Sequence, residues 1–259
     1  MAIKLIADPH GCFENLTREI RKDDVLIVLG DVLDLIDWAD TSGILSEVLG
    51  KDKLVERLMS AVFAGPEAAL ALRDELLSTE GGYFPELLRR VEEQYGAFVA
   101  VLQDIGCRAY VIFGNGDIPD LLEASLDGVG EAVLARGKVE MGGEVFGFIN
   151  GALYSPFQMP AEMDDEAYGS LLRELGPVDV LCTHIPPDVQ AATMDVVAGR
   201  PVEGSASLLE YIEVHRPKIL YHGHVHQPAQ RELMVGDTRV INVGYYKRQG
   251  YVHTHDSHN

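Results

Sequence analysis

The chain has 259 residues, of which 47% are hydrophobic and 24% are charged. These proportions exclude a disordered or fibrous chain, and the length is ample for a full hydrophobic core. With 41 acidic and 21 basic side chains the formal net charge is −20, which disfavours long nucleic acids and anionic membrane surfaces as partners. An anionic substrate would therefore need a local positive centre.

The cysteines and the first residues of the chain indicate in which cellular compartment we expect the protein. Cys12, Cys107 and Cys182 stand far apart and form no CxxC pair, which predicts neither a disulfide framework nor a cysteine zinc site. They favour a reducing, cytoplasmic location. Asp8 and His10 interrupt the first apolar stretch, which argues against a signal peptide, and no apolar run approaches the roughly 18 residues of a membrane span. We expect no membrane partner.

The first part of the chain predicts an α/β pattern that gives way to helices. Buried strands are predicted over 3–7 and 25–29, with a helix over 13–21 between them. From residue 38 to 106 the pattern changes to long amphipathic helices, which we interpret as a helical insertion or cap. Helices packed on the sheet are the favoured interpretation of this stretch, and homo-oligomer contacts through it stay open.

Strands resume after the helical stretch. They are predicted over 109–113, 139–141, 145–149, 178–182, 219–221 and 239–243. Helices are predicted over 166–175 and 207–214. Because there is no internal repeat and no low-complexity linker, we expect residues 1–250 to form a single domain. Residues 251–259, with His253, His255 and His258, are expected to form a flexible, solvated tail.

Side chains that can ligate a metal follow the ends of the predicted strands. They are Asp8, His10, Asp31, Asn115, His184, His224 and His226. In an open α/β sheet the loops beyond the carboxyl ends of the strands form the ligand crevice, so these side chains should converge. Carboxylate, amide and imidazole ligands suit borderline to hard divalent cations. Seven ligands are more than one cation needs, whereas two cations that share one carboxylate would use the whole set.

Each of these residues also has an ordinary structural explanation when it is taken alone. The segment around Asp8 could be a turn, Gly30-Asp31 could lead into a helix, and the segment 114–117 could be an Asn/Gly turn. The histidines of the segment 222–226 are harder to explain in this way, because clustered histidines after a strand have little structural use. The joint occurrence of these blocks in this order favours a metal centre.

The blocks DPH, GD, GN-x-D, a lone strand-end histidine and GHVH, in this order, resemble the calcineurin-like metallophosphoesterase superfamily. The resemblance covers nearly the whole chain apart from the helical insertion. It implies an α/β fold, a four-layer α/β/β/α sandwich, that binds two divalent metal ions and hydrolyses phosphomonoesters or phosphodiesters. Mn, Fe, Zn, Ni and Co all tolerate this donor set, so the identity of the metals stays open.

The resemblance also implies a role for each of the seven ligands. Asp8, His10 and His226 would hold the first metal, Asp31 would bridge both metals, and Asn115, His184 and His224 would hold the second. A water or hydroxide between the metals would have its pKa lowered toward neutrality and would act as the nucleophile. The two cations would supply the positive centre that the acidic surface lacks.

One position departs from the family pattern. Most of the superfamily has GNH followed by Asp or Glu, and this histidine contacts the phosphate or assists the leaving group. Gly116 stands in its place here, while Asn115 and Asp117 are retained and are the predicted catalytic residues. We hypothesise that substrates with poor leaving groups are hydrolysed slowly unless another residue, a metal-bound water or the cap supplies the proton.

Three neighbouring polar residues allow further expectations. Asp34 is either close to the ligands or an acidic residue in the first turn of a helix. We expect His222 to pack at a strand end rather than to bind metal, and Asn242 to support the GHVH loop.

The favoured function is hydrolysis of a small phosphorylated molecule at a dinuclear metal centre. The alternative is a metal-binding scaffold of the same fold with weak catalysis, which the missing histidine and the large insertion favour and the intact ligands oppose. The net charge, and the lack of a basic stretch with interleaved aromatic residues, disfavour a nuclease that acts on long nucleic acid. Cyclic nucleotides, nucleotides and protein phosphosites stay open as substrates.

Overall fold

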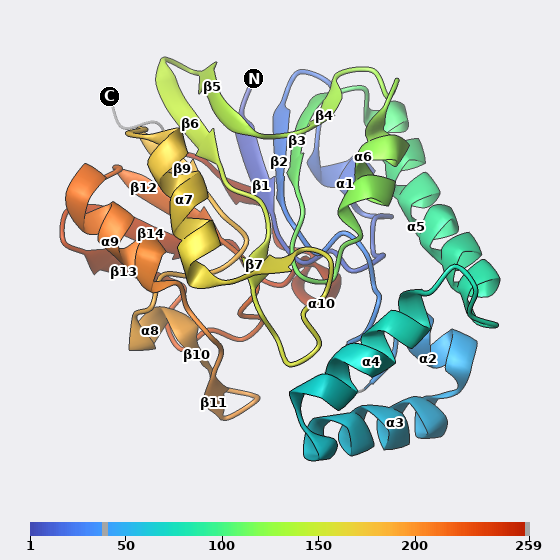
Figure 1. Cartoon of the computed structure of the whole chain (residues 1–259). Coiled ribbons are helices and arrows are strands. Elements are labelled where there is room, and N and C mark those ends of the chain that lie inside the picture. The colour runs from blue at the N-terminus through green and yellow to red at the C-terminus, as the bar shows by residue number, and fades with distance from the viewer. Residues whose placement is uncertain (38–40, 257–259) are drawn as a thin grey trace.

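Two β-sheets packed face to face form the centre of the structure, a computed structural model that describes residues 1–37 and 41–256 (Figure 1). The first sheet has the strand order β15-β1-β2-β3-β4, and the second has the order β13-β14-β12-β9-β6-β5. Helices cover the outer face of each sheet. The molecule therefore has four layers in the order α/β/β/α, and the predicted fold class is confirmed.

Four parallel strands make up most of the first sheet. They are β1 (Ile3–Ile6), β2 (Val25–Leu29), β3 (Arg108–Ile112) and β4 (Ala132–Leu134). Every residue of β2 is apolar and buried, as expected for a parallel strand that is covered on both faces. The carboxyl ends of these strands all lie at one edge of the sheet.

The second sheet has four parallel central strands between two antiparallel edge strands. The central strands are β6 (Glu144–Phe148), β9 (Val180–Cys182), β12 (Ile219–His222) and β14 (Thr238–Asn242). The edges are β5 (Gly137–Met141) and β13 (Glu232–Val235). Two short strand pairs stand apart from the sheets: β7 (Ala152–Leu153) with β8 (Glu162–Met163), and β10 (Met194–Asp195) with β11 (Arg200–Pro201).

Alternation along the strands divides the apolar side chains among three cores. Leu5 and Ile27 belong to the core between the sheets, whereas their neighbours Ile6 and Val28 belong to the core under the first helical layer. The second sheet behaves in the same way, because successive side chains of a strand point to opposite faces. The central core therefore fixes the two sheets against each other and with them the loops at their edges.

Ten helices are described. Against or near the first sheet lie α1 (Leu16–Glu19), α2 (Ile44–Leu49), α3 (Lys51–Ala64), α4 (Pro66–Leu77), α5 (Phe84–Ile105) and α6 (Pro119–Leu126). With the second sheet are α7 (Asp165–Leu175), α8 (Gln190–Thr193) and α9 (Ala206–His215), and α10 (Tyr246–Gln249) follows β14. Within residues 1–37 and 41–256, none of them combines the length and the apolar character that crossing a membrane would require.

The predicted helical stretch from 38 to 106 is helical in its described part, but its helices take two different positions. The buried residues of α5, among them Val91, Phe98 and Leu102, recur every three or four positions and join the core beneath the first sheet. α3 and α4 contribute Leu54 and Leu72 to the same cluster, but they pair with each other at the end of the molecule where the site loops lie (Figure 1). Phe63 of α3 is 82% exposed.

The segment after residue 250 differs from its expectation. β15 (His253–Thr254) pairs with β1 in an antiparallel manner, and His255 is buried. Its Nδ1 lies 2.9 Å from the hydroxyl of Tyr221, and its Nε2 lies 2.9 Å from a carboxylate oxygen of Glu144. The expectation of a solvated tail is therefore wrong for these residues, because they cover the free edge of β1 and satisfy two buried polar groups. His258 lies outside the described residues.

We predict that His255→Ala lowers the free energy of unfolding by about 1–3 kcal/mol, because the Tyr221 hydroxyl and a Glu144 oxygen lose their partner. Urea unfolding measures this change. Thr254→Ala is the matched control, since it alters the exposed side chain of the neighbouring residue. Equal unfolding midpoints for the two variants would show that the two hydrogen bonds of His255 add nothing to stability.

Candidate metal centre

The seven predicted ligands lie in loops that meet where the two sheets end. Asp8, His10, Asp31 and Asn115 follow β1, β2 and β3 of the first sheet, and His184, His224 and His226 follow β9 and β12 of the second. Each sheet therefore contributes one wall of the site. Asn115, His224 and His226 are partly exposed and the other four are buried, which gives the site one open side.

A first cluster joins both walls. Asp8, His10, Asp31 and His226 each offer one ligand atom, and these four atoms all lie within 4.8 Å of one another. The Nε2 atoms of His10 and His226 are 3.3 Å apart, and His10 Nε2 is 3.5 Å from Asp31 Oδ2. Two carboxylates and two imidazoles at this spacing could hold a divalent cation.

A second cluster lies on the other side of Asp31. His184 Nε2 is 3.0 Å from the amide oxygen of Asn115 and 3.5 Å from Asp31 Oδ1. The ring of His224 packs edge-on against that of His184, with 5.0 Å between the ring centroids. The two oxygens of Asp31 thus face two different groups of ligands.

Backbone carbonyls fix which nitrogen of two histidines faces the site. His10 Nδ1 is 3.0 Å from the carbonyl oxygen of Leu33, and His184 Nδ1 is 2.8 Å from that of Leu29. A carbonyl only accepts hydrogen bonds, so Nδ1 carries a proton in both rings, and Nε2 is the nitrogen that faces the site. This is the arrangement that an Nε2 metal ligand requires.

The ligands have unusual backbone conformations. Asp8, His10, Asp31 and His224 have φ values of 54°, 40°, 52° and 64°. Among the described residues only seven that are not glycine have a positive φ, and these ligands are four of them. Such conformations are costly outside glycine and persist where the surrounding structure imposes them, commonly at functional sites.

Two glycines allow the strand-end loops to approach one another. A Cβ atom on Gly114 would lie 2.3 Å from Asp31 Oδ1 and 2.5 Å from His184 Cε1. A Cβ on Gly223 would lie 2.4 Å from the Cβ of Ala7 and 2.7 Å from Asp8 Oδ2. All four distances are shorter than real Cβ contacts, so glycine is required at these positions for the ligands to converge.

Two of the four imidazoles are kept neutral by their surroundings. Burial, together with the neighbouring imidazoles, lowers the pKa of His224 to about 3 and that of His226 to about 4. Burial alone would raise the pKa of the Asp31 carboxyl, but His184 and His10 hold it below its ordinary value. His224 and His226 therefore offer neutral nitrogens and Asp31 offers an ionised carboxylate, which are the forms of these side chains that bind a cation.

Asp117, one of the two predicted catalytic residues, is fully buried beneath the site. Its carboxylate accepts hydrogen bonds from the backbone N–H groups of Val32, Leu33 and Gly114 at 3.0–3.3 Å. It also lies 3.2 Å from the hydroxyl of Tyr95, a residue of α5. Burial raises the pKa of Asp117 to about 7. In this position it joins the loop after β2 to the loop after β3 and holds both in place.

The expectations for three neighbouring residues can now be compared with the structure. Asn242 donates from Nδ2 to the carbonyl of Val225 at 2.9 Å, so it supports the GHVH loop as expected. His222 is buried at the end of β12, with Nδ1 3.0 Å from the carbonyl oxygen of Gly223. Asp34 lies next to the ligands and forms an ion pair with Lys247, 3.0 Å away.

Sequence reasoning missed two side chains beside the first cluster. The ring of Tyr245 lies parallel to that of His226, with 3.8 Å between centroids and an interplanar angle of 8°. Lys247, two residues further on, lies between Asp34 and Asp37. Neither residue follows a strand directly, and a tyrosine in a polar segment carries no sequence signal for stacking on a distant histidine.

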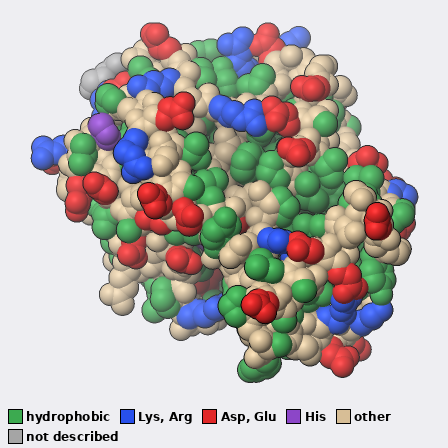
Figure 2. Space-filling model, in the orientation of Figure 1, with side chains coloured by type: hydrophobic (Ala, Val, Ile, Leu, Met, Phe, Trp, Pro, Cys, Tyr) green, Lys and Arg blue, Asp and Glu red, His purple; other side chains and the backbone are tan. Residues whose placement is uncertain are grey.

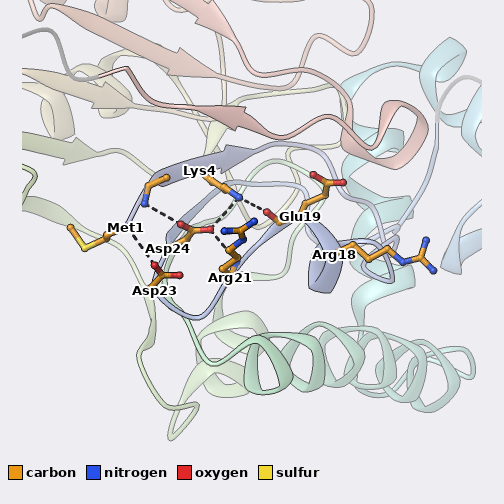
Figure 3. A pocket seen from close by; sticks show the side chains of 8 residues that line it. Met1, Lys4, Arg18, Glu19, Arg21, Asp23 and Asp24 are labelled. Carbon is orange, nitrogen blue, oxygen red and sulfur yellow. Dashed lines mark hydrogen bonds and ion pairs between the residues drawn. The ribbon is translucent and has the colours of Figure 1, made fainter.

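An open hollow at the opposite edge of the first sheet is not part of this site (Figure 3). Lys4 and Asp24 form an ion pair across it at 3.1 Å. The other oxygen of Asp24 accepts the N–H of Ala2 at 3.0 Å. None of the predicted ligands lines the hollow, and the amino group of Met1 forms a second ion pair there with Asp23 at 3.5 Å.

Comparison with known proteins supports the fold. No protein-family model and no curated protein matches the chain. One solved crystal structure, 18% identical over 95% of this chain and 91% of its own, superposes with a TM-score of 0.61. The protein TT1561 of Thermus thermophilus is 13% identical over 98% of this chain and 97% of its own, with a TM-score of 0.55. These likenesses concern the fold alone.

We predict that Gly114→Ala destabilises the protein by about 1–3 kcal/mol, because the added methyl group forces Asp31 and His184 apart. Its affinity for Mn²⁺ should fall as well. Gly96→Ala is the control: it adds the same methyl group to α5 where no atom lies within 4 Å, and it should stabilise the helix by about 0.5–1 kcal/mol. Urea unfolding and calorimetric titration measure both effects, and unchanged Mn²⁺ binding in Gly114→Ala would contradict the tight packing described.

Proposed function

We propose that this chain is a metal-dependent phosphoesterase whose centre holds two divalent cations. The position of Asp31 carries the proposal. Its Oδ2 is 3.5 Å from His10 Nε2, and its Oδ1 is 3.5 Å from His184 Nε2. One carboxylate thus faces a nitrogen ligand in each of two clusters, as a ligand shared by two cations would.

The residues present fit a pair of cations. Asp8, His10 and His226 would hold one cation, Asn115, His184 and His224 would hold the other, and Asp31 would contact both. When bound, the cations would activate water as the nucleophile and stabilise the charge that develops on the phosphoryl oxygens. Mn, Fe, Zn, Ni and Co are all compatible with these ligands.

The balance of charge supports an anionic substrate. Asp8 and Asp31 are the only carboxylates among the seven ligands, and Asn115 adds an oxygen without adding charge. Two dications would therefore leave the centre positive within a chain of formal net charge −20. Acidic side chains are spread over the face seen in Figure 2. A phosphate group would be attracted to the centre and repelled by its surroundings, which focuses binding on the site.

Three segments project around the site, and we propose that they restrict access to it, which favours a small substrate over a polymer. The connection between β7 and β8, the pair β10 and β11, and the helices α3 and α4 all project at the edge where the strands end (Figure 1). Arg73 of α4 donates to the carbonyl of Gln158 at 2.7 Å and so ties the helices to the first of these segments. Asp195 of β10 accepts the N–H of Gln227 at 3.2 Å, next to the ligand His226.

We expect metal-stripped protein reloaded with Mn²⁺ to hydrolyse p-nitrophenyl phosphate or bis-p-nitrophenyl phosphate. Asp31→Asn should reduce turnover to background, because the shared ligand loses its charge. Asp237→Asn removes an exposed carboxylate far from the ligands and should leave turnover unchanged. The ratio of the wild-type rate on p-nitrophenyl phosphate to that on bis-p-nitrophenyl phosphate distinguishes a monoesterase from a diesterase.

Two other outcomes would overturn parts of this proposal. Metal binding without turnover on either ester would favour the alternative, a metal-binding scaffold with weak catalysis. Gly116 supports this alternative, because it stands where most of the superfamily has a histidine. Failure to bind any divalent cation would reject the metal centre itself.

Position 116 allows a separate prediction on leaving groups. A Cβ on Gly116 would contact the Asp31 carboxylate at 3.2–3.5 Å, close but without severe overlap. Gly116→His should raise the rate on an alkyl phosphate relative to p-nitrophenyl phosphate by about 10²-fold or more, because the imidazole can protonate a poor leaving group. Gly116→Ala is the control for crowding of Asp31. Equal rate ratios in the two variants would contradict the prediction.

A further inference from the structure

The histidines of the first cluster are fixed in two different ways. His10 is held by a hydrogen bond from Nδ1–H to the carbonyl of Leu33, 3.0 Å away. For His226, the hydrogen bonds found among the described residues include no such carbonyl: its Nε2 lies 3.3 Å from His10 Nε2, and its ring contacts the rings of His10 and Tyr245. A ligand that is partly exposed and lacks a hydrogen-bonded anchor needs another constraint on its orientation.

Tyr245 supplies such a constraint. Its ring lies 3.8 Å from the ring of His226 at an interplanar angle of 8°, and it meets His10 edge-on at 5.8 Å and 87°. A stacked contact on one imidazole and an edge contact on the next restrict the planes of both rings. Rotation of His226 about its side-chain bonds would break the stacked contact.

Tyr245 is itself held in place by its neighbours. Its hydroxyl donates to Asp37 Oδ2 at 3.0 Å, and Lys247 Nζ lies 3.2 Å from the same oxygen and 3.0 Å from Asp34. The backbone N–H of Lys247 donates to the carbonyl of Asp8 at 3.2 Å. The segment that carries Tyr245 follows β14 of the second sheet, and these contacts tie it to the ligand loops of the first.

We propose that Tyr245 is a positioning residue that orients His226 for metal binding by stacking against its imidazole. The inference rests on the proposed metal centre but not on any particular reaction. It assigns the aromatic ring, rather than the hydroxyl, as the group that acts on His226. The hydrogen bond from the hydroxyl to Asp37 is a further contact on which this role does not depend.

Binding of Co²⁺ to metal-stripped protein, followed by calorimetry and by its visible absorption spectrum, tests this assignment. Tyr245→Leu should weaken binding by about 10–100-fold and change the spectrum, as the loss of a residue that orients a ligand commonly does. Tyr245→Phe keeps the ring and should stay within a few-fold of wild type. Tyr246→Leu is the matched control, because it removes a neighbouring buried ring that belongs to the core under the first sheet.

A double-mutant cycle shows whether Tyr245 acts through His226. In a His226→Ala background, Tyr245→Leu should cost little further Co²⁺ affinity. A full additive loss would overturn the proposal, and so would equal losses in Tyr245→Leu and Tyr246→Leu. If Tyr245→Leu does not fold, Tyr245→Met carries the same test, because its flexible chain fills the space without a ring.

The result separates this inference from the proposed function. A wild-type protein that binds Co²⁺ but hydrolyses no phosphoester would overturn the function and leave the role of Tyr245 measurable. A wild-type protein that binds no Co²⁺ would overturn both.

Discussion

The buried carboxylate of Asp31 lies between imidazoles that belong to opposite sheets, His10 on one side and His184 on the other. A charge at this depth is costly unless it is compensated. The N–H of Gly116 donates to Asp31 Oδ1 at 2.7 Å, and the cations that we propose would compensate the rest. The rest of the site serves this contact. Gly114 lets the loop after β3 reach Asp31, and Asp117 holds that loop against the one after β2. The core between the sheets sets the distance across which the two walls meet.

Much of this arrangement could be predicted from the sequence. The position of each ligand immediately after an apolar strand predicts convergence, because parallel strands end at a common edge. The order of the blocks from Asp8 to His226 predicts the four-layer sandwich through its resemblance to a known family. The expectation for Asn242 was also correct. A polar residue at a strand end next to a ligand loop has hydrogen-bonding partners close by in that loop.

The missed features depend on contacts between segments far apart in the chain. Tyr95 appears in the sequence as one more residue of an amphipathic helix, yet its hydroxyl reaches Asp117. Tyr245 stacks on His226, from which the β13–β14 hairpin separates it in the chain, and no periodicity of the sequence predicts a contact between them. His255 lies in a polar segment whose composition resembles that of a flexible tail. The segment is nevertheless ordered, because it pairs with the free edge of β1 and His255 contacts Tyr221 and Glu144. In each case tertiary contacts outweigh the local pattern.

The left-handed backbone at four of the ligands has a consequence for the protein before any cation binds. Each such residue stores on the order of 1–3 kcal/mol, whereas the whole fold of a typical domain is stable by only about 5–15 kcal/mol. Four of the seven described non-glycine residues with a positive φ lie at the edge where the strands end, so backbone strain is concentrated there. The cations that we propose would bind at this strained edge and would therefore stabilise the folded chain there.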